Sequence, residues 1–227
     1  MTLHIAALFT HDSEGRMLRI NEPDGRGGIA PRFLLGQTRK GSILRFRADV
    51  DADRQRELQE ESARMPRGGD PLVTPLSSEH FCSILERDAP ITALARGPAF
   101  VCPEMRAHGP EATFITPANA EYLRPLFPGW LGDVSHYQPM VALVDGDQAV
   151  SLCCSVRRTG LAHEAGLETA QAARGRGYAL VVVAAWVAAV YATGRVPLYS
   201  TSWDNIASRV VARKLGLIQF GNDLHIT

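Results

Sequence analysis

A glycine-rich run in the second half of the chain constrains the fold more than any other feature. Residues 171–179 read QAARGRGYA and join a strand-like segment, 162–170, to an unbroken apolar stretch, 180–192. Because that stretch is apolar on every face, we expect it to form a buried helix. A glycine-rich turn that opens a helix directs several backbone N–H groups at one place, where the helix dipole favours an anion. Arg174 and Arg176 add positive charge to this candidate anion site.

Other classes of glycine-rich segment fit this run less well. A P-loop requires Lys-Ser or Lys-Thr after its last glycine, whereas Gly177 is followed by Tyr178 and Ala179. The dinucleotide fingerprint requires a third glycine and a later acidic residue, but the third glycine is missing and residues 196–198 are Val-Pro-Leu. A disordered Arg-Gly tail would not lie between apolar segments. An ordinary strand-to-helix turn with two solvated arginines remains open on this run alone.

A second motif follows the apolar stretch. Residues 201–208, TSWDNIAS, lead into residues 209–217, RVVARKLGL. Together with the pattern Arg-x-x-Gly-x-Ala at Arg174, Gly177 and Ala179, the segment resembles the signatures of the GNAT N-acetyltransferase superfamily. In that family the first motif is a pyrophosphate-binding loop, and the second is Asn-x-x-Ala/Ser followed by Lys-Leu-Gly-Phe. A capped amphipathic helix would explain the second motif by itself, but not its occurrence with the loop at this spacing.

Composition excludes several classes of function. The chain has 227 residues, with 24 Lys and Arg against 24 Asp and Glu, so no global basic field attracts nucleic acid or an anionic membrane. The longest apolar run, 178–192, is shorter than the ~18 residues of a membrane span, and the N-terminus lacks a signal-peptide pattern. The four cysteines have no metal or disulfide spacing: Cys82, Cys102, Cys153 and Cys154. We expect a cytoplasmic protein with free thiols and no metal. The oligomeric state cannot be read from the sequence.

Residues 1–110 match no motif, and we expect them to be β-rich. Apolar segments joined by turn residues predict two hairpins, 3–9 with 17–20 and 32–35 with 43–47. Two helices are expected at 51–64 and 77–86. Residues 106–110 mark the candidate boundary with the rest of the chain. The N-terminal region could be a degenerate second lobe or a cap over an acceptor site.

Residues 111–227 carry the resemblance, which implies an α/β (α+β) fold with a mixed, mostly antiparallel sheet flanked by helices. The expected strands are 112–115, 139–144, 148–156, 162–170, 196–202 and 218–226. The expected helices are 117–126, 179–192 and 205–215. The domain organisation we expect is therefore 1–110 and 111–227.

The resemblance also implies acetyl-CoA as co-substrate. In the family, the strand before the loop and the strand after the long helix separate, and pantetheine lies in the gap. Carried over, Leu167 and Thr169 would bind pantetheine through their backbone, and Asn205 and Ser208 would meet its pantetheine or phosphate end. The pyrophosphate would be held by the loop residues Arg174, Gly175, Arg176, Gly177, Tyr178 and Ala179.

Two carboxylates are candidates for the proton acceptor of an amine. Glu164 and Glu168 lie four apart on one expected strand and so on one face. Glu168 is level with the expected thioester and is the first candidate; Glu164 is the second. Either could instead bind a cationic acceptor or pair with an arginine such as Arg157. His163 falls on the opposite face, as a hydrogen-bonded structural histidine.

The chain departs from the family pattern at one catalytic position. Many members place a tyrosine, the proton donor to the leaving thiolate, where this chain has Ala212. Either Tyr199 substitutes for it, or the thiolate leaves unprotonated, which a thiol pKa of about 8.5 allows. The expected function is an N-acetyltransferase acting on a primary amine of a small molecule or peptide. The alternative is a non-catalytic acyl-CoA-binding sensor or regulatory module.

Overall fold

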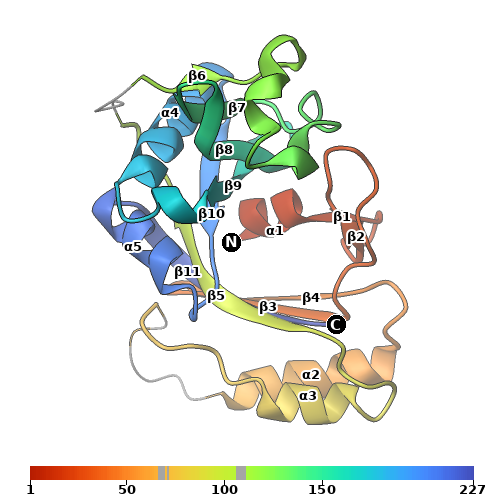
Figure 1. Ribbon diagram of the computed structural model, residues 1–227. Coiled ribbons are helices and arrows are strands. Elements are labelled where there is room, and N and C mark those ends of the chain that lie inside the picture. The colour runs from red at the N-terminus through yellow and green to blue at the C-terminus, as the bar shows by residue number, and fades with distance from the viewer. Residues whose placement is uncertain (66–69, 71, 106–110) are drawn as a thin grey trace.

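The computed structural model describes residues 1–65, 70, 72–105 and 111–227. Its centre is a nine-stranded mixed sheet with helices on both faces, and a separate two-stranded hairpin lies beside it (Figure 1). In spatial order the sheet strands are β4 (Gly41–Phe46), β3 (Phe33–Thr38), β11 (Ile218–Ile226), β5 (Leu94–Val101), β10 (Val196–Ser200), β9 (Ala162–Thr169), β8 (Gln148–Arg158), β7 (Met140–Asp145) and β6 (Thr113–Phe114). The hairpin is β1 (Phe9–His11) with β2 (Met17–Ile20). The α-helices are α1 (Thr2–Leu8), α2 (Ala52–Arg64), α3 (Glu79–Leu85), α4 (Tyr178–Ala192) and α5 (Ile206–Lys214).

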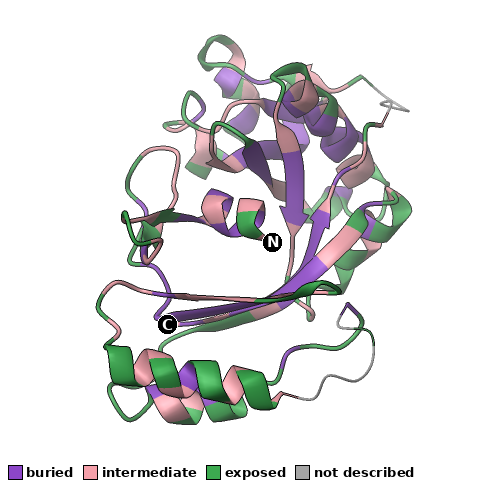
Figure 2. Ribbon diagram, turned by 180° about the vertical axis from the view of Figure 1, so that it is seen from behind, coloured by how far each residue is buried: buried purple, intermediate pink, exposed green. Residues whose placement is uncertain are grey.

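The predicted fold class is confirmed. All strand pairs of the large sheet are antiparallel in the described residues except β9 with β10, which α4 connects. The helix α4 has the buried character that its composition predicts, and its Trp186 is fully buried in the core between α4 and the sheet. Buried residues concentrate along the strands of the large sheet and on the helix faces turned toward it (Figure 2). Cys153 packs in that core, whereas its neighbour Cys154 packs in the core on the opposite face of the sheet.

The strand β5 links the two halves of the chain. It lies between β10 and β11 and is antiparallel to both, with Val101 opposite Leu198 and opposite Ile218. Strands from residues 1–110 and from residues 111–227 therefore share one sheet. The candidate boundary at 106–110 lies outside the described residues. No strand was expected at 94–101, because its sequence, LARGPAFV, contains the strand-disfavouring pair Gly-Pro.

The glycine of that pair has a packing role. A Cβ at Gly97 would lie 1.7 Å from the carbonyl oxygen of Thr201. The N–H of Thr201 donates to Pro98 O at 3.3 Å, and the N–H of Trp203 donates to Arg96 O at 3.2 Å. The residue lets the chain leaving β10 run close against β5, so it is required by tertiary packing and not by a turn.

One predicted element was wrong in type, and another is shorter than expected. Residues 3–9 were expected to be a strand, but residues 2–8 form α1, and only β1 pairs with β2. The run LHIAALF is apolar enough to fit either period, and packing of α1 against β9 decides for a helix. A helix was expected at 117–126, and the structure has a 3₁₀ helix, η1 (Pro117–Leu123), that ends three residues earlier. Pro125 has no N–H to continue a helix, and a second 3₁₀ turn, η2 (Pro128–Trp130), follows.

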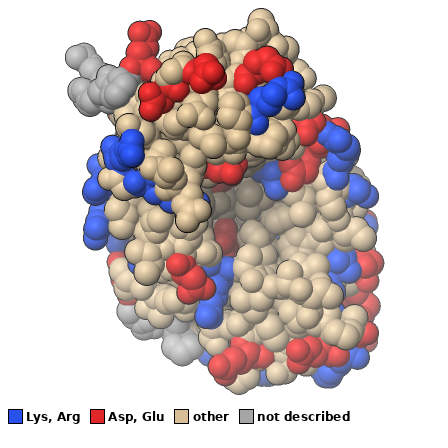
Figure 3. All heavy atoms as spheres, in the orientation of Figure 1, with Lys and Arg blue, Asp and Glu red and all other residues tan. Residues whose placement is uncertain are grey.

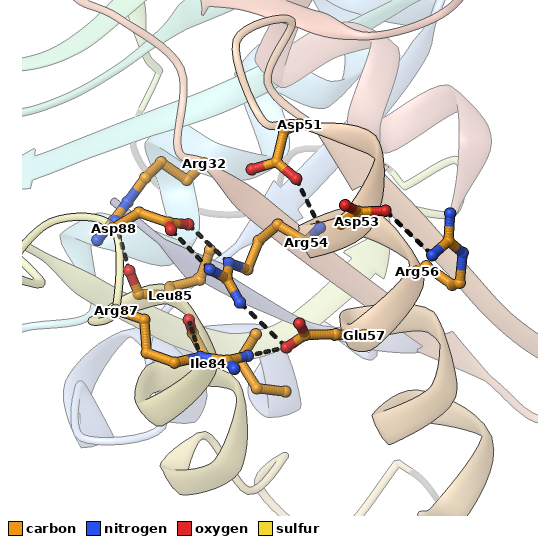
Figure 4. A network of polar contacts seen from close by, with 10 residues as sticks. All are labelled: Arg32, Asp51, Asp53, Arg54, Arg56, Glu57, Ile84, Leu85, Arg87 and Asp88. Carbon is orange, nitrogen blue, oxygen red and sulfur yellow. Dashed lines mark hydrogen bonds and ion pairs between the residues drawn. The ribbon is translucent and has the colours of Figure 1, made fainter.

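The helices α2 and α3 cover the face of the sheet formed by β3, β4 and β11. Leu58 of α2 and Phe81 of α3 are buried there against Phe33 of β3. Arg54 holds the two helices together, with two hydrogen bonds of 2.7 Å to the Asp88 carboxylate (Figure 4). The guanidinium of Arg32, which is buried, donates to carbonyl groups at the end of α3 and just beyond it: Leu85, Ala89 and Pro90. The hairpins at 32–35 with 43–47 and the helices at 51–64 and 77–86 agree with the sequence analysis.

Candidate functional site

The strands β9 and β10 pair only over their first residues and then separate. Their register runs from Ala162 opposite Val196 to Glu164 opposite Leu198 and stops there. Beyond this point β9 still pairs with β8, and β10 still pairs with β5, so the edges that face each other are unpaired. A cavity of about 730 Å³ occupies the separation and extends to the N-terminus of α4.

The cavity gathers most of the residues that the two motifs predicted. Its lining includes Leu167, Glu168, Thr169, Arg174, Gly175, Gly177, Tyr178, Ala179, Tyr199, Asn205 and Ser208. Two predicted residues, Arg176 and Glu164, do not line it. Lys214 does line it, and the sequence analysis missed this residue. The spacing of Ala207, Val211 and Lys214 could have indicated this residue, because it places all three on one face of α5, with Lys214 in the last turn of the helix.

The glycine-rich loop has the backbone geometry of an anion site. Gly175 and Gly177 have φ of +77° and +82°, and Gly177 is the N-cap of α4. The N–H groups of residues 175–179 have no hydrogen-bond partner among the described residues. These donors converge at a helix N-terminus, where the dipole places a partial positive charge. Arg174 is turned back on the loop, with its Nε donating to Thr169 O at 3.2 Å.

The start of α5 forms another wall. The side chain of Asn205 caps this helix by accepting a hydrogen bond from the N–H of Ser208 at 3.0 Å. The Ser208 hydroxyl is 2.6 Å from the hydroxyl of Tyr199 on β10. Burial raises the pKa of Tyr199 to about 12, so its hydroxyl keeps its proton at neutral pH.

Glu168 is the exposed carboxylate of this cavity. It lies on β9 beyond the point where the strands separate, and its Oε2 accepts a 3.0 Å hydrogen bond from Nε1 of Trp130. The indole packs edge-to-face on Tyr137, with ring centroids 5.2 Å apart. No sequence signal indicated this contact, because η2 and β9 are far apart in the chain.

Glu164 lies in a different environment. It is 3% exposed, and its Oε2 is 3.3 Å from Nδ1 of His4 on α1. The other ring nitrogen of His4 is 2.7 Å from Asp223 of β11. Burial opposes the charged imidazolium, but Glu164 and the hydrogen bonds to both carboxylates outweigh it and raise the pKa of His4 to about 10. Glu164 is therefore part of a buried charge cluster covered by α1, and Arg157 pairs with Glu22 instead.

The comparisons with known proteins agree with this geometry. Residues 139–222 match the family model described as GNAT acetyltransferase. No curated protein matches the sequence. A GCN5-related N-acetyltransferase from Sphaerobacter thermophilus has a TM-score of 0.51 at 16% identity, over 92% of this chain and 79% of that chain. A GCN5-related N-acetyltransferase-like protein from Streptococcus suis has a TM-score of 0.50 at 16% identity, over 87% and 85%.

A third structure is similar over a shorter region. It is a putative acetyltransferase of the GNAT family from Novosphingobium aromaticivorans, with a TM-score of 0.51, 16% identity and 60% of this chain covered. The matched region spans 65% of the length of that protein. At such identities these structures establish the fold alone, which is similar to that of GNAT proteins. The family-model match over residues 139–222 includes the separated strands, the loop and α5, so this part of the chain is similar to a GNAT acetyltransferase domain.

Proposed function

We propose that this protein is an N-acetyltransferase that transfers an acetyl group from acetyl-CoA to a primary amine of a small molecule or peptide. One observation carries the proposal: the cavity between β9 and β10 ends at the loop of residues 175–179, whose five N–H groups have no hydrogen-bond partner in the part of the chain that the structure describes. A pantetheine arm can pair with the unpaired edge of β9 at Leu167 and Thr169, while the loop holds the pyrophosphate. Lys214 of α5 and Arg174 of the loop both line this cavity and supply positive charge to it.

The reaction proposed is direct attack of the amine in a ternary complex. The amine nitrogen attacks the thioester carbonyl carbon, a C–N bond forms, and the C–S bond breaks to release the CoA thiolate. Glu168 accepts the proton that the ammonium must lose, directly or through a water. A backbone N–H of β9 would stabilise the oxyanion, and a donor excluded from bulk water is stronger there than in solution. Tyr199 is the proposed donor to the thiolate; otherwise the thiolate leaves unprotonated.

The acceptor is proposed to approach from the face that carries α1. On this face a hollow lies near the centre of the molecule, with acidic atoms inside it (Figure 3). Negative charge there favours a cationic amine. We propose that residues 1–110 shape this acceptor side, whereas residues 111–227 hold the acetyl-CoA site. Photo-crosslinking with a CoA analogue should label residues 111–227; labelling mainly before residue 100 would contradict this division.

Substitution of the loop tests cofactor binding. Gly177→Val should weaken acetyl-CoA binding by more than about tenfold, because a β-branched residue cannot adopt φ near +82° without strain. No atom lies within 4 Å of a Cβ at Gly177, so the effect comes from the backbone and not from a clash. Gly132→Val is the matched control, since its Cβ is also unobstructed and its φ is not positive. Equal calorimetric affinity in folded Gly177→Val and wild-type protein would refute the assignment.

A non-catalytic acyl-CoA-binding module is the second candidate. It is favoured by Ala212 at the usual tyrosine position and by the engagement of Glu168 with Trp130 and of Tyr199 with Ser208. Both candidates predict cofactor binding, so affinity does not separate them. Release of free thiol, measured against a panel of primary amines, does: turnover above the hydrolysis rate supports the enzyme, and its absence with tight acetyl-CoA binding supports the module.

A further inference from the structure

A second cavity, of about 660 Å³, lies at the other end of α4. Its walls come from the C-terminal end of α4, from the turn between β8 and β9, and from β6. The helix α4 has 15 residues and is therefore about 22 Å long, which separates this cavity from the glycine-rich loop. The residues that carry the argument are Arg158, His163, Arg195, Phe114, Pro139 and Ala189, all of which line it.

A buried hydrogen-bond chain decides which nitrogen of His163 carries the proton. The indole Nε1 of Trp186 can only donate, and it lies 3.1 Å from the hydroxyl oxygen of Ser155. That hydroxyl lies 2.8 Å from Nδ1 of His163. Since Ser155 is fully buried, its own proton is satisfied only if it donates to Nδ1. Nδ1 is then an acceptor, and Nε2 carries the N–H. This Nε2 has no hydrogen-bond partner among the described residues, although His163 is only 5% exposed.

The cavity is also positively charged. Neither Arg158 nor Arg195 forms an ion pair with a carboxylate in the described part of the chain. Their guanidinium groups each donate to a backbone carbonyl, Arg158 to Gln138 O and Arg195 to Thr193 O. Burial, and then the charges of Arg158 and Arg195, lower the pKa of His163 to about 4, so the ring is neutral at pH 7. The described residues that line the cavity include no aspartate or glutamate.

The helix dipole opposes an anion here but does not cancel this charge. A helix C-terminus carries a partial charge of about −0.5, against two full guanidinium charges. The final carbonyl groups of α4 are also engaged: Val190 O accepts from Thr193, and Tyr191 O accepts from Gly194. The cavity therefore offers two cations and one imidazole N–H, and none of the described residues that line it is a carboxylate.

We propose that this cavity binds a small organic anion, with its carboxylate or phosphate group between Arg158, Arg195 and the Nε2–H of His163. The body of the ligand rests on an apolar wall formed by Phe114, Pro139 and Ala189. Phe114 is 56% exposed, so its ring is accessible to a ligand in this cavity. Guanidinium forks bind carboxylate and phosphate oxygens in pairs, so both head groups fit. The site is independent of acyl transfer.

Nuclear magnetic resonance of ¹⁵N-histidine-labelled protein tests this site. Benzoate and phenyl phosphate are the probes, benzamide is the uncharged analogue of benzoate, and inorganic phosphate lacks the apolar body. We expect both aromatic anions to shift the Nε2 resonance of His163 saturably, and benzamide to leave it unchanged. Inorganic phosphate should bind at least tenfold more weakly than phenyl phosphate. Saturating CoA should not compete.

Variants locate the binding. Arg158→Gln with Arg195→Gln should reduce benzoate affinity by more than tenfold, whereas Arg56→Gln with Arg64→Gln, which removes two charges from exposed positions of α2, should not. His163→Gln retains a donor and should bind more tightly than His163→Phe; if both fail to fold, the arginine variants carry the test. The proposal is overturned if no anion shifts the Nε2 resonance of His163 at about 10 mM, or if benzamide binds as tightly as benzoate. It is also overturned if the double variant of Arg158 and Arg195 binds benzoate normally, or if inorganic phosphate binds as tightly as phenyl phosphate.

Discussion

Glu164 and Glu168 occupy the same face of the same strand, yet they have different environments. Glu164 lies at the last position where β9 pairs with β10, and α1 covers it, so its carboxylate is buried against His4. Glu168 lies four residues further along, where the two strands have separated, and it is exposed in the cavity beside Trp130. The comparison shows that the point of strand separation divides β9 into a structural part and a candidate catalytic part.

The largest effect is expected on kcat when Glu168 is replaced, and it tests whether this part of β9 is catalytic. Glu168→Gln should lower kcat by about 10² to 10⁴-fold, the usual contribution of a general base, and leave acetyl-CoA affinity nearly unchanged. Higher pH should partly restore the rate, because more of the amine is then neutral. Steady-state kinetics from pH 6 to 9 measure both effects. Glu164→Gln is the matched control and should retain kcat once corrected for folded protein; wild-type kcat in Glu168→Gln would assign proton acceptance elsewhere.

Removing the partner of Glu164 in the buried part of β9 should lower the free energy of unfolding. His4→Leu leaves Glu164 and Asp223 buried without their shared cation, which should lower the free energy of unfolding by about 3–5 kcal/mol. Chemical denaturation measures this change. His80→Leu removes an exposed histidine paired with Glu61, and a surface pair of this kind contributes at most about 1 kcal/mol. Similar losses in the two variants would mean that the buried cluster is not a structural unit.

The stability of the folded protein should depend on pH through His4, the partner of Glu164. The pKa of His4 is raised to about 10 in the folded protein, above an unfolded value of about 6.5. The stabilisation from charged His4 is therefore complete below about pH 6.5 and is lost as pH rises toward 10. Between pH 7 and 10 the wild type should lose up to about 1.4 kcal/mol per pH unit more than His4→Gln. Parallel curves for the two proteins would contradict the raised pKa.

The smallest effect on kcat is expected for Tyr199, which lies on β10, on the other side of the cavity from Glu168. Tyr199→Phe removes the hydroxyl that bonds Ser208, and it should lower kcat by less than about tenfold, because a thiol with a pKa of about 8.5 yields an adequate leaving group. Presteady-state thiol release separates loss of the proton donor from slower product release. If Tyr199→Phe lowered kcat as much as Glu168→Gln does, Tyr199 would be an essential general acid, and β10 would contribute as much to catalysis as β9.

The sequence predicted those parts of the fold that depend on short segments. The loop glycines, the cap at Asn205 and the hairpin of β7 with β8 follow from residues a few positions apart, and the structure has them where expected. The strand β5 was missed because Gly97 and Pro98 disfavour a strand locally, and only the neighbours β10 and β11 supply its pairing. The prediction for the N-terminal segment was wrong because its apolar run fits both a strand and a helix, and only tertiary packing makes residues 2–8 a helix.

The candidate sites divide in the same way. The loop could be found from the sequence, because glycine conformation and helix N-terminal donors are backbone properties set within a few residues. The second cavity could not, since Arg158, His163 and Arg195 form a site only after β8, β9 and the end of α4 are packed together. Alternation along β9 likewise placed Glu164 and Glu168 on one face. Only the tertiary structure decided that α1 buries the first and that strand separation exposes the second, because burial depends on which distant segment covers a residue.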